Sequence, residues 1–506
     1  MIIIPNVFIK KINFTNLISI DTIIKFLMNR SINNDYGGKK MISRIFRKES
    51  VDNYLKADSQ LKRTLGPWDL IGLGIGAVIG TGIFILPGHE AAQHAGPAVA
   101  IAFFIAALLS GIVGMAYAEF SSAMPIAGSA YSFATVVYGE IIGWMLGWAL
   151  ILEYFLAVSA EATGFAAYFN NNILDAVGVH LPKALQSGPM DGGVINITAV
   201  LIILVIAFIV ARGSELSKKV ENIAVIVKVA IILLFIGLGA FYIKSSNYVP
   251  FYPAEFHSSW LGLGGISTAA ATVFFAFIGF DALASNSAET VNPQKNIIRG
   301  ILGTVIIAVI LYVVFSLVLV GMVPYTHLNV DDPAAYALHL AHLDGWNKVI
   351  TVGALFGIFT AMLTMFFGGS RLVYALGRDG LLSGKMGKID PKYKVPKNAI
   401  IIALIVQAFF AGVVPLEQLA SLINAGTLLA FAGMSFGIIP LRKRNDITNT
   451  GFKMPWYPVL PVCAGLASIY FIIMLPDATK ISVAIWLVIG LIVYFAYGIK
   501  HSKLSD

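Results

Sequence analysis

The sequence contains a single cysteine, Cys463, and only 12% of its residues are charged. One cysteine excludes both an intramolecular disulfide and a metal centre built from several thiolates. Hydrophobic residues make up 58% of the 506 positions, more than a soluble domain of this length can bury. Runs of about 20 apolar residues recur from residue 68 onward, and each is long enough to span a bilayer. We therefore expect an all-α integral membrane protein with the lipid bilayer as its surroundings.

The excess of positive charge has a definite distribution along the chain. A net charge of +8 would favour a nucleic-acid partner if it gathered on one soluble face. Instead, most lysines and arginines lie in alternate connections between the apolar runs, so no nucleic-acid partner is expected. The intervening connections hold only Lys183, Lys244, Lys348 and Lys480. The positive-inside rule then predicts a multi-pass protein of the cell membrane with both termini in the cytoplasm.

The hydropathy pattern predicts about twelve transmembrane helices. They cover residues 68–94, 97–123, 139–172, 193–211, 217–243, 260–288, 296–322, 346–376, 397–413, 416–440, 457–475 and 481–500.

The first forty residues differ from the rest, because they contain neither a convincing span nor a signal-peptide pattern. Met41 opens the basic stretch "MISRIFRKES", and "GGKK" immediately precedes it. We interpret residues 1–40 as a gene-model extension, with a disordered or interfacial leader as the alternative. Residues 41–66 are then a cytoplasmic N-terminal segment.

The stretch "IGAVIGTGIFILPG" in the first span is unusually rich in glycine. Glycine inside a helix costs about 1 kcal/mol relative to alanine. Close helix packing through Gly72, Gly76 and Gly80 is one explanation, since small residues at this spacing let helices approach. It explains neither Gly82 nor Thr81. We therefore predict that the helix unwinds near residues 79–82, so that its freed N–H groups bind a carboxylate. The predicted binding residues are Ile79, Gly80, Thr81, Gly82 and Ile83.

A second interrupted span, "FFAFIGFDALASNSAET", lies five spans later. Its freed carbonyl groups, at Phe275, Ala276, Phe277 and Ile278, are predicted to accept hydrogen bonds from an ammonium group. Two such interruptions at matching positions are typical of a transporter's binding site. They predict two inverted repeats, residues 67–243 (TM1–5) and 260–440 (TM6–10). Residues 457–500 (TM11–12) add two C-terminal helices.

These motifs, together with "YAEFSSAMPIAGSAY" and "SRLVYALGRDGLL", resemble the amino acid–polyamine–organocation superfamily. Bacterial members of its cationic amino acid transporter family are the most similar. The resemblance covers roughly residues 60–500. It implies a five-plus-five inverted repeat with unwound helices 1 and 6, an L-amino acid substrate, and alternating access. One departure is Glu289–Thr290, which stands where an acidic pair is common.

Ionisable residues inside apolar spans are functional candidates by default. The resemblance places the ammonium of Lys228 where some relatives bind a sodium ion. An ammonium can substitute for that ion, so the resemblance implies that the proton is the coupling species and that no cofactor is needed. The alternative is a lysine with a purely structural role. It also implies that Glu153 is proton-linked, with Tyr312 as its hydrogen-bond partner. The alternative is that Glu153 faces a cavity and only helps to solvate it. Glu161 is the second acid of that span. No metal site is expected.

Several further residues are expected to have lesser roles. Glu119 is expected to act in a gate or in packing. Asp281 is expected to cap a half-helix or touch substrate, and Phe280 to close the site as an aromatic gate. Five histidines are expected to lie solvated in loops: His89, His94, His327, His339 and His342.

The eighth predicted span indicates which side chains are transported. Met365 is bulky and the span offers no acid, so a desolvated cation would lack a partner there. We predict proton-coupled uptake of small or medium neutral L-amino acids, with arginine or lysine as the alternative. A membrane enzyme and a channel are distant alternatives, because neither a catalytic motif nor a filter repeat is present. Cys463 lies inside a span, so no disulfide-linked subunit is expected.

Overall fold

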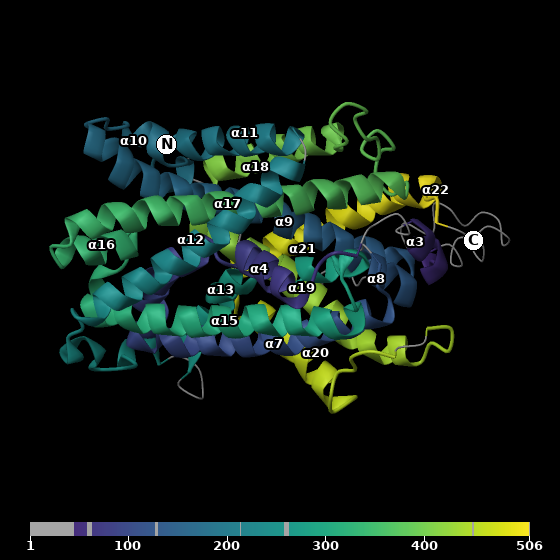
Figure 1. The fold of residues 1–506 in the computed structure, drawn as a ribbon, viewed down its shortest axis with the longest axis horizontal. Coiled ribbons are helices and arrows are strands. Elements are labelled where there is room, and N and C mark those ends of the chain that lie inside the picture. Colours follow the sequence, from purple (N-terminus) through teal and green to yellow (C-terminus); the bar gives the residue numbers. More distant parts are fainter. Residues whose placement is uncertain are drawn as a thin grey trace, which may run out of the picture.

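The computed structural model describes residues 45–57, 63–126, 130–212, 214–257, 263–447 and 450–504. The interpretation of residues 1–40 therefore falls outside the described residues. Within these ranges the chain is almost entirely helical, and its only β-type pairing is an isolated bridge between Leu65 and Thr290. The helices form an elongated bundle (Figure 1), with α3 (Val51–Ala57) near one end and α16 (Pro333–Leu340) near the other. We call these the α3 end and the α16 end.

The bundle is built mainly from uninterrupted helices of 15 to 35 residues. They are α7 (Val99–Ala123), α9 (Glu140–Phe169), α11 (Ile197–Ala211), α12 (Ser214–Ala240), α15 (Pro293–Met322), α17 (Asp344–Arg378), α18 (Lys397–Val413), α19 (Leu416–Arg442), α20 (Val459–Met474) and α21 (Asp477–Val493).

Each of the twelve predicted spans contains helix, and the prediction of an all-helical, multi-span membrane protein is confirmed. Among the described residues, seven helical segments are long and apolar enough to cross a membrane, and five shorter apolar helices accompany them. Short helices that were not predicted include α3, α16, α10 (Lys183–Gln186), and α8 (Ala130–Val137) near the α3 end.

The first predicted span is interrupted as expected. Helix α4 (Pro67–Val78) starts at a proline, and the N–H of Gly66 donates to the Asp69 carboxylate at 2.8 Å, which fixes its first turn. The helix ends at Ile79, whose backbone is extended. Helix α5 (Thr81–Phe84) follows, and α6 (Leu86–Glu90) and a π-helical turn, η3 (Ala91–Ala95), continue the span.

The sixth predicted span is also interrupted. Helix α13 (Gly264–Val273) tightens into the 3₁₀ turn η10 (Phe274–Phe277), and the chain is extended at Ile278. Gly279 has φ +114°, a conformation that side chains disfavour, so glycine is required at this position. Helix α14 (Ala282–Ser285) then resumes. The break thus follows from the local sequence.

The two broken helices lie in the interior of the bundle. Figure 1 shows α4 and α13 at its centre, with α7, α12, α15, α17 and α19 around them. Burial agrees with this arrangement. In the most apolar part of the span that contains α13, 83% of the residues are buried inside the protein, whereas the value is only 22% for the C-terminal span that contains α21. The added C-terminal helices therefore lie on the outside. The inverted relation of the two sets of five helices, and the domain boundaries drawn from it, stay predictions.

At the α3 end, the chain segments next to the two broken helices are hydrogen-bonded to each other. The N–H groups of Thr64 and Leu65 donate to the carbonyl of Glu289 at 2.9 and 3.0 Å, and Val291 N–H donates to the Leu65 carbonyl at 2.9 Å. The segment that precedes α4 is thereby hydrogen-bonded to the segment that follows α14. Both half-helices that point toward the α3 end are tied together.

Candidate functional site

The end of α4 exposes backbone carbonyls that two side chains from other helices satisfy. Lys228 of α12 donates from Nζ to the carbonyls of Gly76 and Ile79, at 2.7 and 2.9 Å. Its side chain is fully buried, so it does not reach the membrane surface. A cation at a helix C-terminus is favourable, because the carbonyl ends carry partial negative charge.

The position of Lys228 agrees with what the resemblance implies. Besides its bonds to α4, its stem packs against α17: a Cβ on Gly357 would lie 3.3 Å from the Lys228 Cβ. The ammonium therefore lies between the first and the eighth predicted spans. This geometry serves the coupling role and the structural role equally well.

Tyr312 of α15 connects the two interrupted helices. Its hydroxyl lies 3.0 Å from the Val78 carbonyl oxygen in α4 and 2.9 Å from the Ala276 carbonyl oxygen in η10. The breaks also touch directly, because a Cβ added to Gly82 would lie 2.7 Å from the Ala276 Cα. The predicted residues of the two breaks, Ile79 to Ile83 and Phe275 to Ile278, are thus brought together and are buried.

The pairing predicted for Tyr312 is wrong. Glu153 and Tyr312 form no hydrogen bond in the described structure: the Tyr312 hydroxyl contacts the carbonyls of Val78 and Ala276, and the Glu153 carboxylate faces Thr427 of α19. Glu153 instead interacts electrostatically with Asp281, whose Oδ2 accepts from the Tyr154 hydroxyl at 3.3 Å. The reason is geometric, since Glu153 lies nearer the α3 end than the break that Tyr312 contacts.

Glu161, two helical turns further along α9, lies in the first break. The N–H of Thr81 donates to its Oε2 at 2.8 Å. A Cβ on Gly80 would lie only 2.2 Å from Oε1, so glycine is what lets the carboxylate approach. Lys228 and Tyr312 both interact with this carboxylate electrostatically. The sequence interpretation noted Glu161 and gave it no role.

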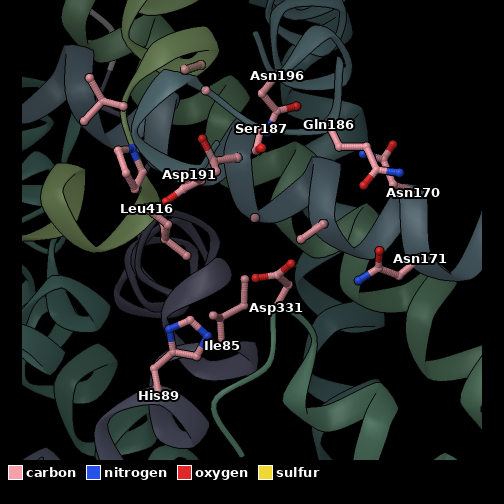
Figure 2. A pocket seen from close by; sticks show the side chains of 17 residues that line it. Ile85, His89, Asn170, Asn171, Gln186, Ser187, Asp191, Asn196, Asp331 and Leu416 are labelled. Carbon is pink, nitrogen blue, oxygen red and sulfur yellow. The ribbon is translucent and has the colours of Figure 1, made fainter. Parts of the chain in front are cut away.

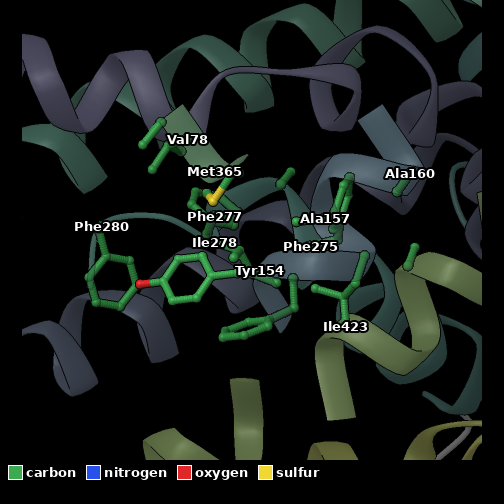
Figure 3. Packing of buried hydrophobic residues seen from close by; sticks show 14 of the residues in the cluster. Val78, Tyr154, Ala157, Ala160, Phe275, Phe277, Ile278, Phe280, Met365 and Ile423 are labelled. Atoms are coloured by element: carbon green, nitrogen blue, oxygen red, sulfur yellow. The ribbon is translucent and has the colours of Figure 1, made fainter. Parts of the chain in front are cut away.

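Apolar side chains pack around the two breaks (Figure 3). Met365 of α17 lies against the second break, because a Cβ on Gly279 would be 2.7 Å from its terminal methyl carbon. Phe280 points toward Tyr154 in this view and packs edge-on against Tyr117. Phe280 is therefore buried among aromatic rings beside the second break, and its role as a gate stays a prediction.

A pocket with both polar and apolar walls lies beside Ile85 and His89 (Figure 2). Its volume is about 110 Å³. Its wall includes Ile85, Thr163 and Gly164, and a Cβ on Gly164 would lie 2.2 Å from the Thr81 side chain. The remaining wall combines apolar residues such as Val414 and Leu416 with amide and carboxylate side chains, which are Asn170, Asn171, Gln186, Asn196, Asp191 and Asp331. Gly164 therefore packs between this pocket and Thr81, which does not itself line the pocket.

Two of the histidines are not solvated as expected. The Nε2 of His89 lies 2.8 Å from the Val330 carbonyl oxygen, and its Nδ1 lies 3.3 Å from Glu417. The Nδ1 of His94 lies 2.8 Å from the buried carboxylate of Glu90. The cause is that helix continues through α6 and η3, which turns these rings into the protein. His327, His339 and His342 are exposed, as expected.

Acidic side chains at both ends of the bundle hold segments in place. Burial raises the pKa of Asp332, just before α16, to about 6, while Asn172 Nδ2 donates to its carboxylate at 2.7 Å. At the α3 end, Glu119 accepts from the Arg442 guanidinium at 2.7 and 2.8 Å and from Met454 N–H at 2.6 Å. Glu119 thus has a packing role between α7 and α19.

Comparison with known proteins agrees with this arrangement. The profile of the family "Amino acid permease" matches residues 65–497. The methylthioribose transporter of Bacillus subtilis is 44% identical over 92% of this chain and 100% of its own length. The branched-chain amino acid permease BcaP of the same species is 42% identical over 91% of this chain and 99% of its own. A vacuolar cationic amino acid transporter of Arabidopsis thaliana is 34% identical over 79% of this chain and 67% of its own length.

The chain therefore belongs to the amino acid permease family, within the amino acid–polyamine–organocation superfamily. The resemblance read from the motifs is confirmed at this level. By their names, the relatives are transporters and not enzymes.

Proposed function

We propose that this protein imports neutral L-amino acids of small or medium size across the cell membrane, coupled to protons, by alternating access. The observation that carries the proposal is a half-helix N-terminus that binds a carboxylate beside the apolar side chains of the second break. The N–H of Thr81, at the start of α5, already binds a carboxylate, that of Glu161, and Met365 packs against the neighbouring second break. Helix N-terminal N–H groups favour carboxylates, and apolar walls favour uncharged side chains.

The partner groups for the ammonium come from the second break. The carbonyl of Ala276 already accepts from Tyr312, and a carbonyl oxygen has a second lone pair to offer. The Lys/Arg distribution supports a cytoplasmic α3 end, and with it both termini. The backbone pairing of Leu65 with Glu289 and Thr290 would then be the contact that separates when the site opens inward.

Uptake into proteoliposomes tests this proposal. Labelled L-isoleucine should accumulate when the outside is made acidic, and a protonophore should abolish accumulation. Unlabelled alanine and valine should compete, while arginine should compete weakly. Uptake that ignores the proton gradient, or that arginine inhibits better than alanine, would contradict the proposal.

Methylthioribose is a second candidate substrate. One relative is named as its transporter. In addition, Glu161 fills the place where an amino acid would bring its own carboxylate. Uptake of labelled methylthioribose in the same assay decides between the two substrates. If isoleucine is itself transported and also inhibits methylthioribose uptake, the amino acid is the favoured substrate.

A further inference from the structure

The carboxylate of Glu161 and the carboxylate of an amino acid substrate would need the same position. Glu161 Oε2 accepts the N–H of Thr81, the first residue of α5, at 2.8 Å. Its Oε1 lies over Gly80, where a Cβ would be 2.2 Å away. One backbone N–H cannot serve two carboxylates at full strength. Substrate binding at this break therefore requires Glu161 to move.

The charged groups around Glu161 determine which interactions its carboxylate loses when it moves. Of the described titratable groups, Lys228 of α12 and Tyr312 of α15 face it. Glu153 is the next acid on its own helix, about 12 Å away along the axis, and it faces Asp281. Lys228 remains bonded to the carbonyls of Gly76 and Ile79 and is available to a carboxylate that replaces Glu161.

We propose that Glu161 is a carboxylate that the chain itself places in the substrate's carboxylate subsite, and that it leaves this subsite with an added proton when the substrate binds. This inference rests on the proposed function. The substrate carboxylate takes over the Thr81 N–H and the electrostatic partner Lys228. Glu161 loses its donor in a buried place, where an ionised carboxylate is costly, so it takes up one proton. One proton and one zwitterion then move together, carrying one net positive charge.

This assignment makes Glu161 a coupling and specificity residue. A zwitterionic amino acid has to displace it, whereas a ligand without a carboxylate does not. In this proposal, proton dependence arises from competition at a single N–H group, that of Thr81, which the structure shows bound to Glu161. A coupling site at Glu153 would not compete with the substrate in this way.

Equilibrium binding to the purified full-length protein tests the proposal. Dissociation constants are measured for L-isoleucine and for L-isoleucinamide, which lacks the carboxylate, at mildly acidic and mildly alkaline pH. The variant is Glu161→Gln, which keeps the shape and an acceptor for Thr81 and removes the charge. Glu153→Gln is the matched control, since it makes the same change in a buried acid of the same helix.

At mildly alkaline pH, Glu161→Gln should bind isoleucine roughly tenfold or more tightly than wild type, because a charge-assisted hydrogen bond no longer competes. Its affinity should also depend less on pH. Isoleucinamide should show neither effect, and Glu153→Gln should not tighten isoleucine binding. Should Glu161→Gln fail to fold, the wild-type comparison suffices: isoleucine must bind more weakly as pH rises, and isoleucinamide must not follow it.

Equal isoleucine affinity and equal pH dependence in wild type and Glu161→Gln would overturn the inference and leave the proposed function intact. If neither protein binds any neutral L-amino acid, the proposed function fails and the inference falls with it. If methylthioribose binds to wild type and is lost in Glu161→Gln, Glu161 is a substrate ligand and not a competitor.

Discussion

The ammonium of Lys228 lies 2.9 Å from the carbonyl oxygen of Ile79, the first extended residue after α4. A second bond, to Gly76, is 2.7 Å long. An uninterrupted helix would satisfy these carbonyls with its own N–H groups one turn later. Here a fully buried cation takes their place, so the charge of Lys228 and the unwinding of the helix depend on each other.

Replacing Lys228 by methionine should therefore affect both coupling and folding. We expect the pH profile of uptake to shift, because Glu161 loses its cationic partner, and apparent thermal stability to fall. Leaving a buried carbonyl unsatisfied costs about 1–3 kcal/mol. Uptake by proteoliposomes across a pH series and thermal unfolding in detergent measure the two effects. A variant that loses stability yet keeps the wild-type pH profile would assign Lys228 a structural role only.

Tyr312→Phe removes one oxygen and leaves the ring packing of Phe277 and Phe103 unchanged. Because that hydroxyl joins Val78 to Ala276, we expect the breaks to separate and isoleucine to bind several-fold more weakly. The expected loss of stability is about 1–3 kcal/mol. Tyr325→Phe is the control, since its exposed hydroxyl bonds only to Glu255 outside the site. Wild-type affinity in Tyr312→Phe would show that the hydroxyl does not hold the site together.

The breaks were predictable because each leaves a local signature. Gly80 and Gly82 interrupt an apolar run, and Gly279 has a backbone conformation that demands glycine. Lys228 was predictable for a similar reason, since one lysine in a long apolar run has few acceptable environments.

The role of Glu161 was not predictable in the same way. Glu153 and Glu161 both lie in an apolar helix that is buried on nearly all sides. Eight residues rotate a helix by about 80° beyond two full turns, so the two acids point in different directions. A helix without a polar face does not reveal which direction leads to the break. The contacts of His89 with Val330 and Glu417 were missed because they join segments far apart in the sequence.

Asp332 gives the protein a pH-dependent stability at the α16 end. Burial raises its pKa in the folded state to about 6, above the usual value of about 3.9. Between these values the folded state binds more protons than the unfolded state, so stability falls as pH rises. Above pH 6 the penalty is fully present, at most roughly 3 kcal/mol.

Asp332→Asn removes this titration, and the new amide oxygen can still accept from Asn172. We expect the variant to unfold at a higher temperature than wild type at neutral pH, and the difference to shrink below the pKa of about 6. Thermal unfolding in detergent at fixed scan rate measures it. Asp331→Asn serves as the control, since that neighbouring carboxylate is exposed. A pH-independent difference would show that Asp332 does not titrate as stated.

The last prediction concerns the side chain that the site accepts. Met365 is 4% exposed and lies against Gly279 and the apolar residues around the second break. Met365→Ser removes this bulk, so we expect phenylalanine and arginine to compete better for isoleucine uptake and isoleucine to bind more weakly. The matched control is Met322→Ser, because Met322 packs on Gly239 between α12 and α15, away from the breaks. That variant should lose stability and keep the wild-type order of competitors. The same competition order in Met365→Ser as in wild type would show that Met365 does not border the substrate, and the preference for neutral side chains would then need another origin.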